Sequence, residues 1–185
     1  AIAASTGGPP ALRRILMDLP RTLPLPILVV QHIARDFTAG FAEWLAASCA
    51  LRVKLAEDGE RLNDGVVHVA PDDAHLGVSR DGRVVLSNDP PIAGFRPSAT
   101  HLFASAGRAY GPRLLAVVLT GMGSDGARGA FRLALLASIT FLSPGFPFRI
   151  VGSTMLRAGR LIPGVRSRSG RHLRVHPRAF GTVFR

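Results

Sequence analysis

Three residues of this chain have the side chains that ester hydrolysis by a serine nucleophile requires, and each follows a short apolar run. They are Ser5, His32 and Asp125, in that order along 185 residues. A serine hydroxyl is a weak nucleophile until a base such as histidine takes its proton, and a carboxylate then orients the imidazole. This set of residues therefore predicts nucleophilic attack on a carbonyl carbon.

Taken alone, each of the three residues also fits a structural role: Ser5 a helix cap, His32 a hydrogen-bonded core residue, and Asp125 a turn. Their order differs from the Ser, Asp, His order of α/β-hydrolases. The surroundings of Ser5 favour catalysis, because Gly7 and Gly8 follow it where a strand is expected to turn into a helix. Backbone N–H groups and the positive end of a helix can stabilise an oxyanion there.

Apolar periodicity predicts alternating strands and helices around these residues. The expected strands cover residues 2–4, 27–30, 66–69, 83–86 and 114–119, and the expected helices cover residues 11–19, 37–45 and 98–109. This alternation predicts an α/β fold with a doubly wound, largely parallel sheet and helices on both faces, three layers in all, incomplete at both termini. Because ligands bind beyond the carboxyl ends of parallel strands, the three polar residues are expected to meet at that edge.

Turn and cap signals add two local predictions. Residues 66–69 and 83–86 are expected to form a hairpin-like insertion, because the second segment follows the Asp81-Gly82 turn signal. Thr38 or Asp36 is expected to cap the start of the helix over residues 37–45, since short polar side chains accept hydrogen bonds from the first free N–H groups of a helix.

Size and cysteine content limit the class of protein. A chain of 185 residues with 47% hydrophobic content can bury one substantial core. Cys49 is the single cysteine, so no intrachain disulfide forms, and no segment has the pattern of a secretory signal. The apolar runs are shorter than the roughly 20 residues that cross a bilayer. These features predict a cytoplasmic protein without membrane insertion.

Charge is distributed unevenly along the chain. The formal net charge is +11, but residues 1–130 hold 13 basic and 12 acidic residues, whereas residues 131–185 hold 10 arginines and no acidic residue. The first part is therefore nearly neutral, which makes nucleic acid an unlikely partner for it. We accordingly predict two parts, a catalytic domain over residues 1–130 and an atypical Arg-rich tail over residues 131–185.

Several strings of the first part resemble the catalytic domain of the chemotaxis receptor methylesterases, the CheB family. They are STGGP at residues 5–9, VQH at 30–32, VAP at 69–71, RPS at 96–98 and LTGMGSDGA at 119–127. The resemblance covers about 130 residues in the family's order. Two positions depart from the family's common pattern, with Ala3 in place of glycine and Thr100 in place of aspartate.

The resemblance implies a protein-glutamate methylesterase that hydrolyses γ-glutamyl methyl esters on chemoreceptors to glutamate and methanol, with glutamine deamidation by the same route. It implies Ser5 as nucleophile, His32 as base and Asp125 as the residue that orients it. The backbone N–H of Met122, with Thr6 nearby, would hold the oxyanion. No metal or organic cofactor is required. The implied partners are methyl-accepting chemotaxis receptors, with a receiver domain acting in trans as a candidate.

The tail does not resemble the family's ending. An abrupt change to Arg-rich, acid-free sequence is what a frameshift in a GC-rich gene produces, so one hypothesis is a frameshift near residue 130 and a tail that folds poorly. Resequencing the locus would contradict it if no alternative frame restored a family-like ending. Two other interpretations stay open: a catalytically inactive remnant, and a basic arm that binds nucleic acid through residues such as Arg166, Arg168 and Arg171.

Overall fold

The computed structural model describes residues 1–119, Asp125 and residues 138–141. Six strands form one sheet in the order β3-β4-β2-β1-β7-β8. They are β1 (Ile2–Ala4), β2 (Ile27–Gln31), β3 (Arg52–Leu55), β4 (Val66–Val69), β7 (Leu115–Val118) and β8 (Ser138–Phe141). Every neighbouring pair is parallel. The predicted parallel α/β sheet is therefore confirmed.

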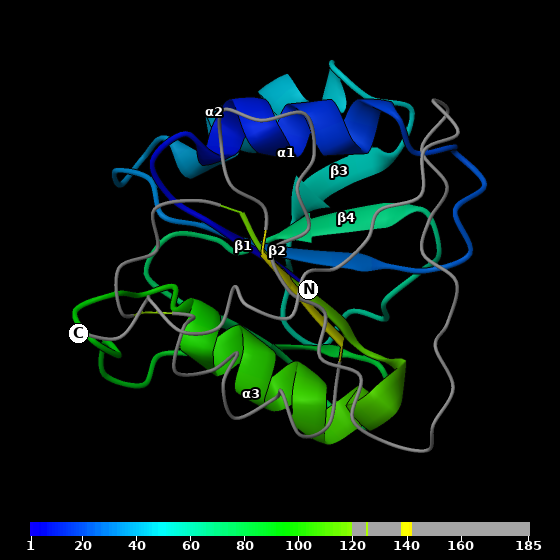
Figure 1. The fold of residues 1–185 in the computed structure, drawn as a ribbon. Helices are drawn as coiled ribbons and strands as arrows, with labels where there is room; N and C mark the ends of the chain where they lie inside the picture. Colours follow the sequence, from blue (N-terminus) through cyan, green and yellow to red (C-terminus); the bar gives the residue numbers. More distant parts are fainter. Residues whose placement is uncertain (120–124, 126–137, 142–185) are drawn as a thin grey trace, which may run out of the picture.

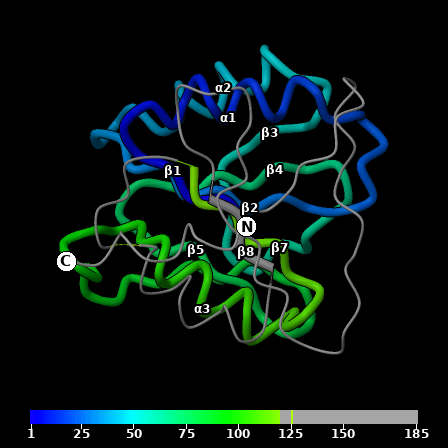
Figure 2. Tube along the Cα trace, in the orientation of Figure 1, coloured from blue at the N-terminus to red at the C-terminus, as the bar shows by residue number. Residues whose placement is uncertain are grey.

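The N-terminal strand lies in the middle of this sheet. Ile2 pairs with Val29 of β2 on one side and with Val117 of β7 on the other. Figure 2 shows how the chain returns to β1 with β7, after it has built the β2 side of the sheet. The direction of strand addition thus reverses at β1, and such a reversal opens a crevice beyond the carboxyl ends of the strands.

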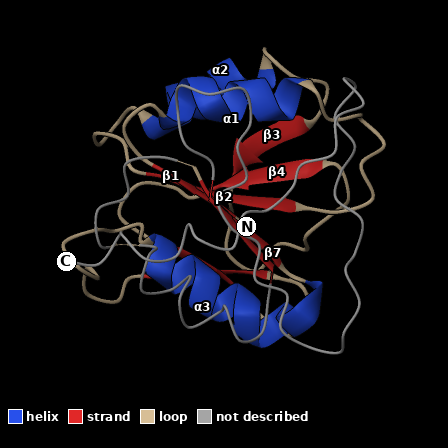
Figure 3. Cartoon of the chain, in the orientation of Figure 1, coloured by secondary structure: helices blue, strands red, loops and turns tan. Residues whose placement is uncertain are grey.

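Helices cover both faces of the sheet, as predicted (Figure 1). Two helices, α1 (Gly8–Met17) and α2 (Thr38–Ala46), pack on one face, and α3 (Ala99–Tyr110) packs on the other, followed by a short 3-10 turn, η1 (Gly111–Arg113). Figure 3 shows the red strands between these two blue layers. None of the helices in the described ranges has the length and apolar character that crossing a membrane would need.

Alternation along the strands divides the core in two. Ala4 of β1 packs with α1 and α2, in a cluster that includes Leu12 and Phe41. Ala3, the neighbouring residue, packs with α3 on the opposite face, in a cluster that includes Phe103. Successive side chains of a strand point to opposite faces, so each central strand must be apolar throughout. This explains the short uninterrupted apolar runs in the sequence.

The predicted hairpin was only partly right. Residues 66–69 form β4, which lies inside the parallel sheet between β3 and β2 and is buried along its whole length. The hairpin consists instead of β5 (His75–Val78) and β6 (Val84–Ser87), joined through the Asp81-Gly82 turn. Both β3 and β5 escaped prediction, because β3 carries two basic residues and β5 contains a histidine and a glycine.

The predicted cap of α2 was wrong. The N-cap residue of this helix is Phe37, and it makes no side-chain cap hydrogen bond. The Thr38 hydroxyl donates to Asp72 instead, and Asp36 has a positive φ of 68°, with its N–H bonded to the same carboxylate. Asp72 therefore anchors the start of α2 from a neighbouring loop, which local sequence could not reveal.

Candidate functional site

Ser5 lies at the carboxyl end of the central strand, in the tight turn that starts α1. Gly7 has a φ of 76°, a left-handed conformation that favours glycine, and the Gly8 N–H donates to the Ser5 carbonyl over 2.7 Å. The helix begins at Gly8, and the two prolines that follow have no N–H to donate. The turn holds Ser5, half-buried, beside the positive end of α1, while Thr6 is exposed next to it.

His32 leaves the sheet directly beside Ser5. Ala4 pairs with Gln31 in the parallel register, and the His32 N–H donates to the Ala4 carbonyl over 2.8 Å. The Gln31 side chain then joins the two strand ends, because its amide nitrogen donates to the carbonyls of Ser5 at 3.0 Å and His32 at 2.8 Å. The sequence pattern did not predict this role for Gln31, although the string VQH at residues 30–32 resembles the family.

Asp125 is fully buried and binds the imidazole. Its Oδ2 lies 3.0 Å from Nε2 of His32. The start of α3 supplies three more donors to the carboxylate: the Ser98 hydroxyl at 2.7 Å, the Ala99 N–H at 2.8 Å and the Thr100 N–H at 3.1 Å. The free donors at the N-terminus of α3 therefore bind the carboxylate and hold it opposite His32.

These hydrogen bonds control the ionisation of Asp125. Burial by itself raises the pKa of the carboxyl group, but the hydrogen bonds from His32, Thr100, Ser98 and the Ala99 N–H outweigh it and hold the pKa well below its ordinary value. Asp125 is consequently a carboxylate at neutral pH, as a residue that orients an imidazole must be.

The His32 ring is held on its face as well as at its edge. It stacks on Phe95, with centroids 4.0 Å apart and the two planes 4° from parallel. Because the Asp125 carboxylate accepts from Nε2, the proton lies on Nε2 and the lone pair lies on Nδ1. Nδ1 is buried and has no partner among the described residues. It is the ring nitrogen left free to accept a proton.

The structure thus brings two of the predicted site residues into contact and places the third beside them. Within residues 1–119, 125 and 138–141, the Ser5 hydroxyl makes no hydrogen bond, so its approach to His32 stays a prediction. Met122 lies outside the described residues. Ser98 and Phe95 were not predicted as site residues; Ser98 belongs to the RPS string, whereas nothing in the sequence marked Phe95.

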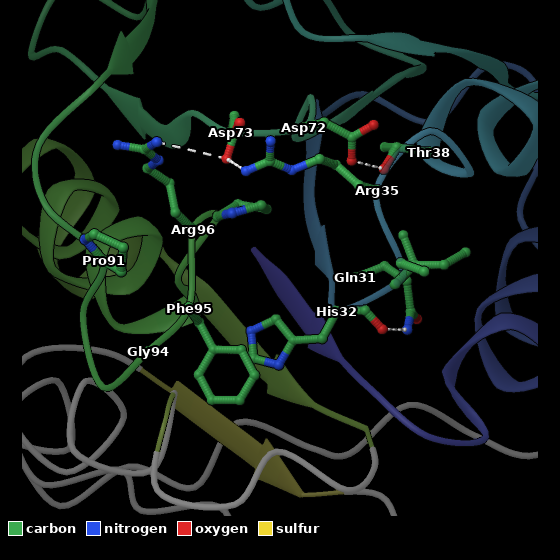
Figure 4. Close-up of a pocket in the computed structure, with 13 residues that line it drawn as sticks. Gln31, His32, Arg35, Thr38, Asp72, Asp73, Pro91, Gly94, Phe95 and Arg96 are labelled. Carbon is green, nitrogen blue, oxygen red and sulfur yellow. Dashed lines mark hydrogen bonds and ion pairs between the residues drawn. The ribbon is translucent and has the colours of Figure 1, made fainter.

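A pocket of about 490 Å³ opens beside His32 (Figure 4). Its walls come from the loops after β2 and β4 and from the segment that precedes α3. Asp73 lies between two guanidinium groups, with oxygen–nitrogen distances of 2.6 Å to Arg35 and 3.5 Å to Arg96. The described residues contain no cluster of metal ligands. The pocket therefore has room for a side chain of a protein substrate next to His32.

Comparison with known proteins decides the family. Residues 1–142 match the family model described as CheB methylesterase. The chain belongs to this family. The match extends past residue 130, where the sequence pattern changes, so the predicted resemblance is confirmed and the boundary between domain and tail stays a prediction. Residues 131–137 and 142–185 lie outside the described residues.

Curated CheB methylesterases are similar over much of this chain. "Protein-glutamate methylesterase/protein-glutamine glutaminase 4" of Myxococcus xanthus is 49% identical over 178 residues, which cover 91% of this chain and 50% of that protein. "Protein-glutamate methylesterase/protein-glutamine glutaminase 3" of Anaeromyxobacter dehalogenans is 58% identical over 130 residues, 70% of this chain and 38% of that protein. The chain spans half or less of the length of these relatives.

The fold agrees with a solved member of the CheB family. The crystal structure of the Thermotoga maritima CheB methylesterase catalytic domain superposes with a TM-score of 0.69 at 41% sequence identity, and the match covers 71% of each chain. The arrangement of strands and helices described above is therefore that of a CheB catalytic domain.

One prediction concerns the turn that holds Ser5 in this CheB domain. A Cβ atom on Gly8 would lie 2.7 Å from the Ala4 Cβ and would also meet the Gln31 amide, which two hydrogen bonds hold in place. We expect Gly8→Ala to lower the free energy of unfolding by about 1–3 kcal/mol. Urea unfolding of the two proteins would measure it.

Gly40 offers the matched control for this substitution. It lies within α2, and a Cβ atom there would meet nothing within 4 Å. Gly40→Ala should therefore leave stability unchanged or raise it by up to about 1 kcal/mol, because alanine favours a helix over glycine. Equal stability losses in the Gly8 and Gly40 variants would contradict the proposed close packing at Gly8.

A second prediction follows from the ionisation of Asp125. Its folded-state pKa is lower than its ordinary value of about 3.9. The carboxylate therefore contributes stability that is present above the ordinary pKa and is lost as the pH falls through the folded-state pKa. We expect Asp125→Asn to be less stable than wild type near neutral pH, by a margin that shrinks in acid. Urea unfolding between about pH 7 and pH 3 tests this; a constant margin would contradict it.

Proposed function

We propose that this chain carries the catalytic centre of a protein-glutamate methylesterase that uses Ser5 as its nucleophile. The observation that carries the proposal is the His32 ring, which Asp125 holds through Nε2. Its buried Nδ1 has no partner among the described residues, and the ring lies beside the strand that Ser5 follows. A base with its lone pair free, an ionised carboxylate behind it and a hydroxyl on the adjacent strand end are the requirements of acyl transfer through serine.

In the first half of the reaction, the Ser5 hydroxyl oxygen attacks the ester carbonyl carbon while Nδ1 of His32 takes its proton. The tetrahedral intermediate then collapses: the bond to the methoxy oxygen breaks, His32 returns the proton to that oxygen, and methanol leaves. Asp125 stabilises the imidazolium that exists between these two transfers. The product is a glutamyl ester of Ser5.

Water completes the cycle by the same route in reverse. His32 takes a proton from water as the water oxygen attacks the glutamyl ester, and then gives it back to the Ser5 oxygen as the carboxyl group of glutamate is released. A glutamine side chain follows the same steps, with ammonia leaving in place of methanol. The chain's own residues supply every proton transfer, so the reaction requires no cofactor.

The oxyanion of both tetrahedral intermediates needs hydrogen-bond donors. We assign the Met122 N–H and the neighbourhood of Thr6 to this role on the strength of the family resemblance. The turn at Ser5 supports the assignment, because the positive end of α1 lies at the same point. In that turn the Gly8 N–H donates to the Ser5 carbonyl, whereas the Thr6 and Gly7 N–H groups have no acceptor within the described part of the chain and remain for a ligand.

The proposed substrates are methylated glutamates of methyl-accepting chemotaxis receptors in the cytoplasm, and a receiver domain acting in trans is the proposed regulator. The names of the curated relatives support the glutamate ester and the glutamine amide as substrates. The pocket beside His32 supports a protein side chain as the reacting group, because loops line it and it is large enough to hold a side chain.

Methanol release from a methylated chemoreceptor tests this function directly. The purified chain should release methanol and lose that activity when Ser5 is replaced by alanine. Release by both proteins would contradict Ser5 as the nucleophile. Release by neither would favour the inactive remnant, and circular dichroism of the same samples would show whether the chain is folded.

A further inference from the structure

We propose that His75 is a positioning residue for the His32–Asp125 pair, because its one ring holds both segments that support this pair. The inference rests on the proposed function. His75 lies at the start of β5 and is fully buried. Its Nδ1 is 3.1 Å from the Ser98 backbone nitrogen, and its Nε2 is 3.2 Å from the Pro90 carbonyl oxygen.

The two partners of His75 select one tautomer. A backbone N–H can only donate, so Nδ1 must accept from Ser98; a carbonyl oxygen can only accept, so Nε2 must donate to Pro90. The ring therefore makes both hydrogen bonds at once only when the single proton is on Nε2. In this state His75 ties the segment before α3 to the helix start itself.

The Ser98 side of this link leads to Asp125. Ser98 is the N-cap of α3, and its hydroxyl donates to Asp125 Oδ1 over 2.7 Å. The N–H groups of the next two residues, Ala99 and Thr100, bind the same carboxylate. A shift of the Ser98 backbone would therefore move the hydrogen bonds that the start of α3 makes to Asp125.

The Pro90 side of the link leads to His32. Residues 88–97 form the loop that carries Phe95, whose ring stacks on the face of His32. Arg96 reaches back to the same loop, donating to the Asn88 carbonyl over 3.2 Å. His75 thus fixes the loop that supports one member of the pair, and the helix start that supports the other.

The strand that carries His75 packs closely against α3. The His101 ring stacks on the His75 ring, with centroids 4.9 Å apart, and its Nδ1 donates to the Leu76 carbonyl over 3.2 Å. A Cβ atom on Gly77 would lie only 3.1 Å from the His101 ring, so glycine permits this close approach. The β5–β6 hairpin therefore packs closely on α3 and places His75 next to the start of this helix.

Two substitutions separate the two hydrogen bonds of the His75 ring. His75→Asn places an acceptor near the position of Nδ1 and keeps the bond from Ser98, whereas His75→Gln places a donor near the position of Nε2 and keeps the bond to Pro90. We expect His75→Gln to lower kcat about tenfold to a hundredfold, since a shift of about 1 Å at a catalytic group has effects of that size. His75→Asn should retain more kcat than His75→Gln. Its larger effect should be on KM, because it loses the bond to Pro90 and so loosens the loop of residues 88–97. Methanol release from methylated chemoreceptor measures both constants.

A control variant distinguishes positioning from packing. His101→Asn disturbs the same stack and keeps a donor near Nδ1. The His101 side chain bonds to neither Ser98 nor Pro90, and the backbone N–H that donates to the Ser98 hydroxyl is retained. We therefore expect kcat to stay within about twofold of wild type. Equal kcat values for His75→Gln and His75→Asn would overturn the proposal, as would an equal loss of kcat in His101→Asn.

A spectroscopic readout keeps this test independent of the proposed activity. The His32 proton shared with Asp125 should give a low-field proton resonance, and that resonance should shift or broaden in His75→Gln and persist in His101→Asn. An unchanged resonance in a folded His75→Gln variant would overturn the positioning role, even if the wild-type chain released no methanol. If His75→Gln does not fold, an unchanged resonance and unchanged kinetics in His75→Asn would overturn it instead.

Discussion

Replacing Ser5 with alanine should lower methanol release from a methylated chemoreceptor by about 10⁵-fold or more, the scale seen when a serine hydrolase loses its nucleophile. The substitution removes the oxygen that forms the acyl-enzyme and leaves the rest of the site intact. Ser5 contributes its carbonyl to the hydrogen bonds from Gly8 and Gln31, and a backbone carbonyl survives the change. The fold should therefore be retained, as thermal unfolding would show.

Ser48→Ala provides the matched control. The Ser48 hydroxyl donates to the Trp44 carbonyl and accepts from Arg13, just after the end of α2. This variant should keep wild-type methanol release. A Ser5→Ala protein that retains more than about 1% of wild-type turnover while folded would show that another group performs the attack.

Replacing Asp125 with asparagine should lower kcat by about 10⁴-fold, the size of the effect when a serine hydrolase loses the carboxylate that orients its histidine. The Ser98 hydroxyl and the Thr100 N–H both donate to Oδ1, so they would bind the amide oxygen there. The amide nitrogen would then take the place of Oδ2, opposite His32 Nε2 and the Ala99 N–H. His32 Nε2 would then have to accept, so the ring proton would move to Nδ1. A protonated Nδ1 cannot take the proton of Ser5.

The change of tautomer gives this prediction a specific signature. Because the substitution forces the wrong tautomer, turnover should recover partly at high pH, where hydroxide can replace the missing base, whereas a variant that has merely lost its structure should not recover. Asp81→Asn is the control: Asp81 lies in the β5–β6 turn, where it pairs with Ser79 and Arg83. Comparable losses in the two variants would contradict the specific role of Asp125.

The sequence predicted the central part of the sheet correctly, and physical reasons limit what else it could predict. β1 and β2 are buried on both faces, so they appear as uninterrupted apolar runs. β7 is apolar throughout as well, although Leu115 at its start is exposed. β3 lies at one edge of the sheet, and basic and apolar residues alternate along it. β5 begins with a histidine that packs on α3, so neither strand shows such a run. Assigning β4 to the main sheet required its pairing with β2, which is a long-range property.

The candidate site divides in the same way. Ser5 and His32 follow directly after apolar strands, so the sequence alone predicted that both lie at the carboxyl edge of the sheet. The pairing of β1 with β2 then makes their strand ends neighbours. Tertiary structure decided the rest: that the start of α3 grips Asp125, that Phe95 covers the His32 ring, and that His75 links them. These contacts join residues 15 to 63 positions apart, and no local periodicity encodes which side chain will meet which across such distances.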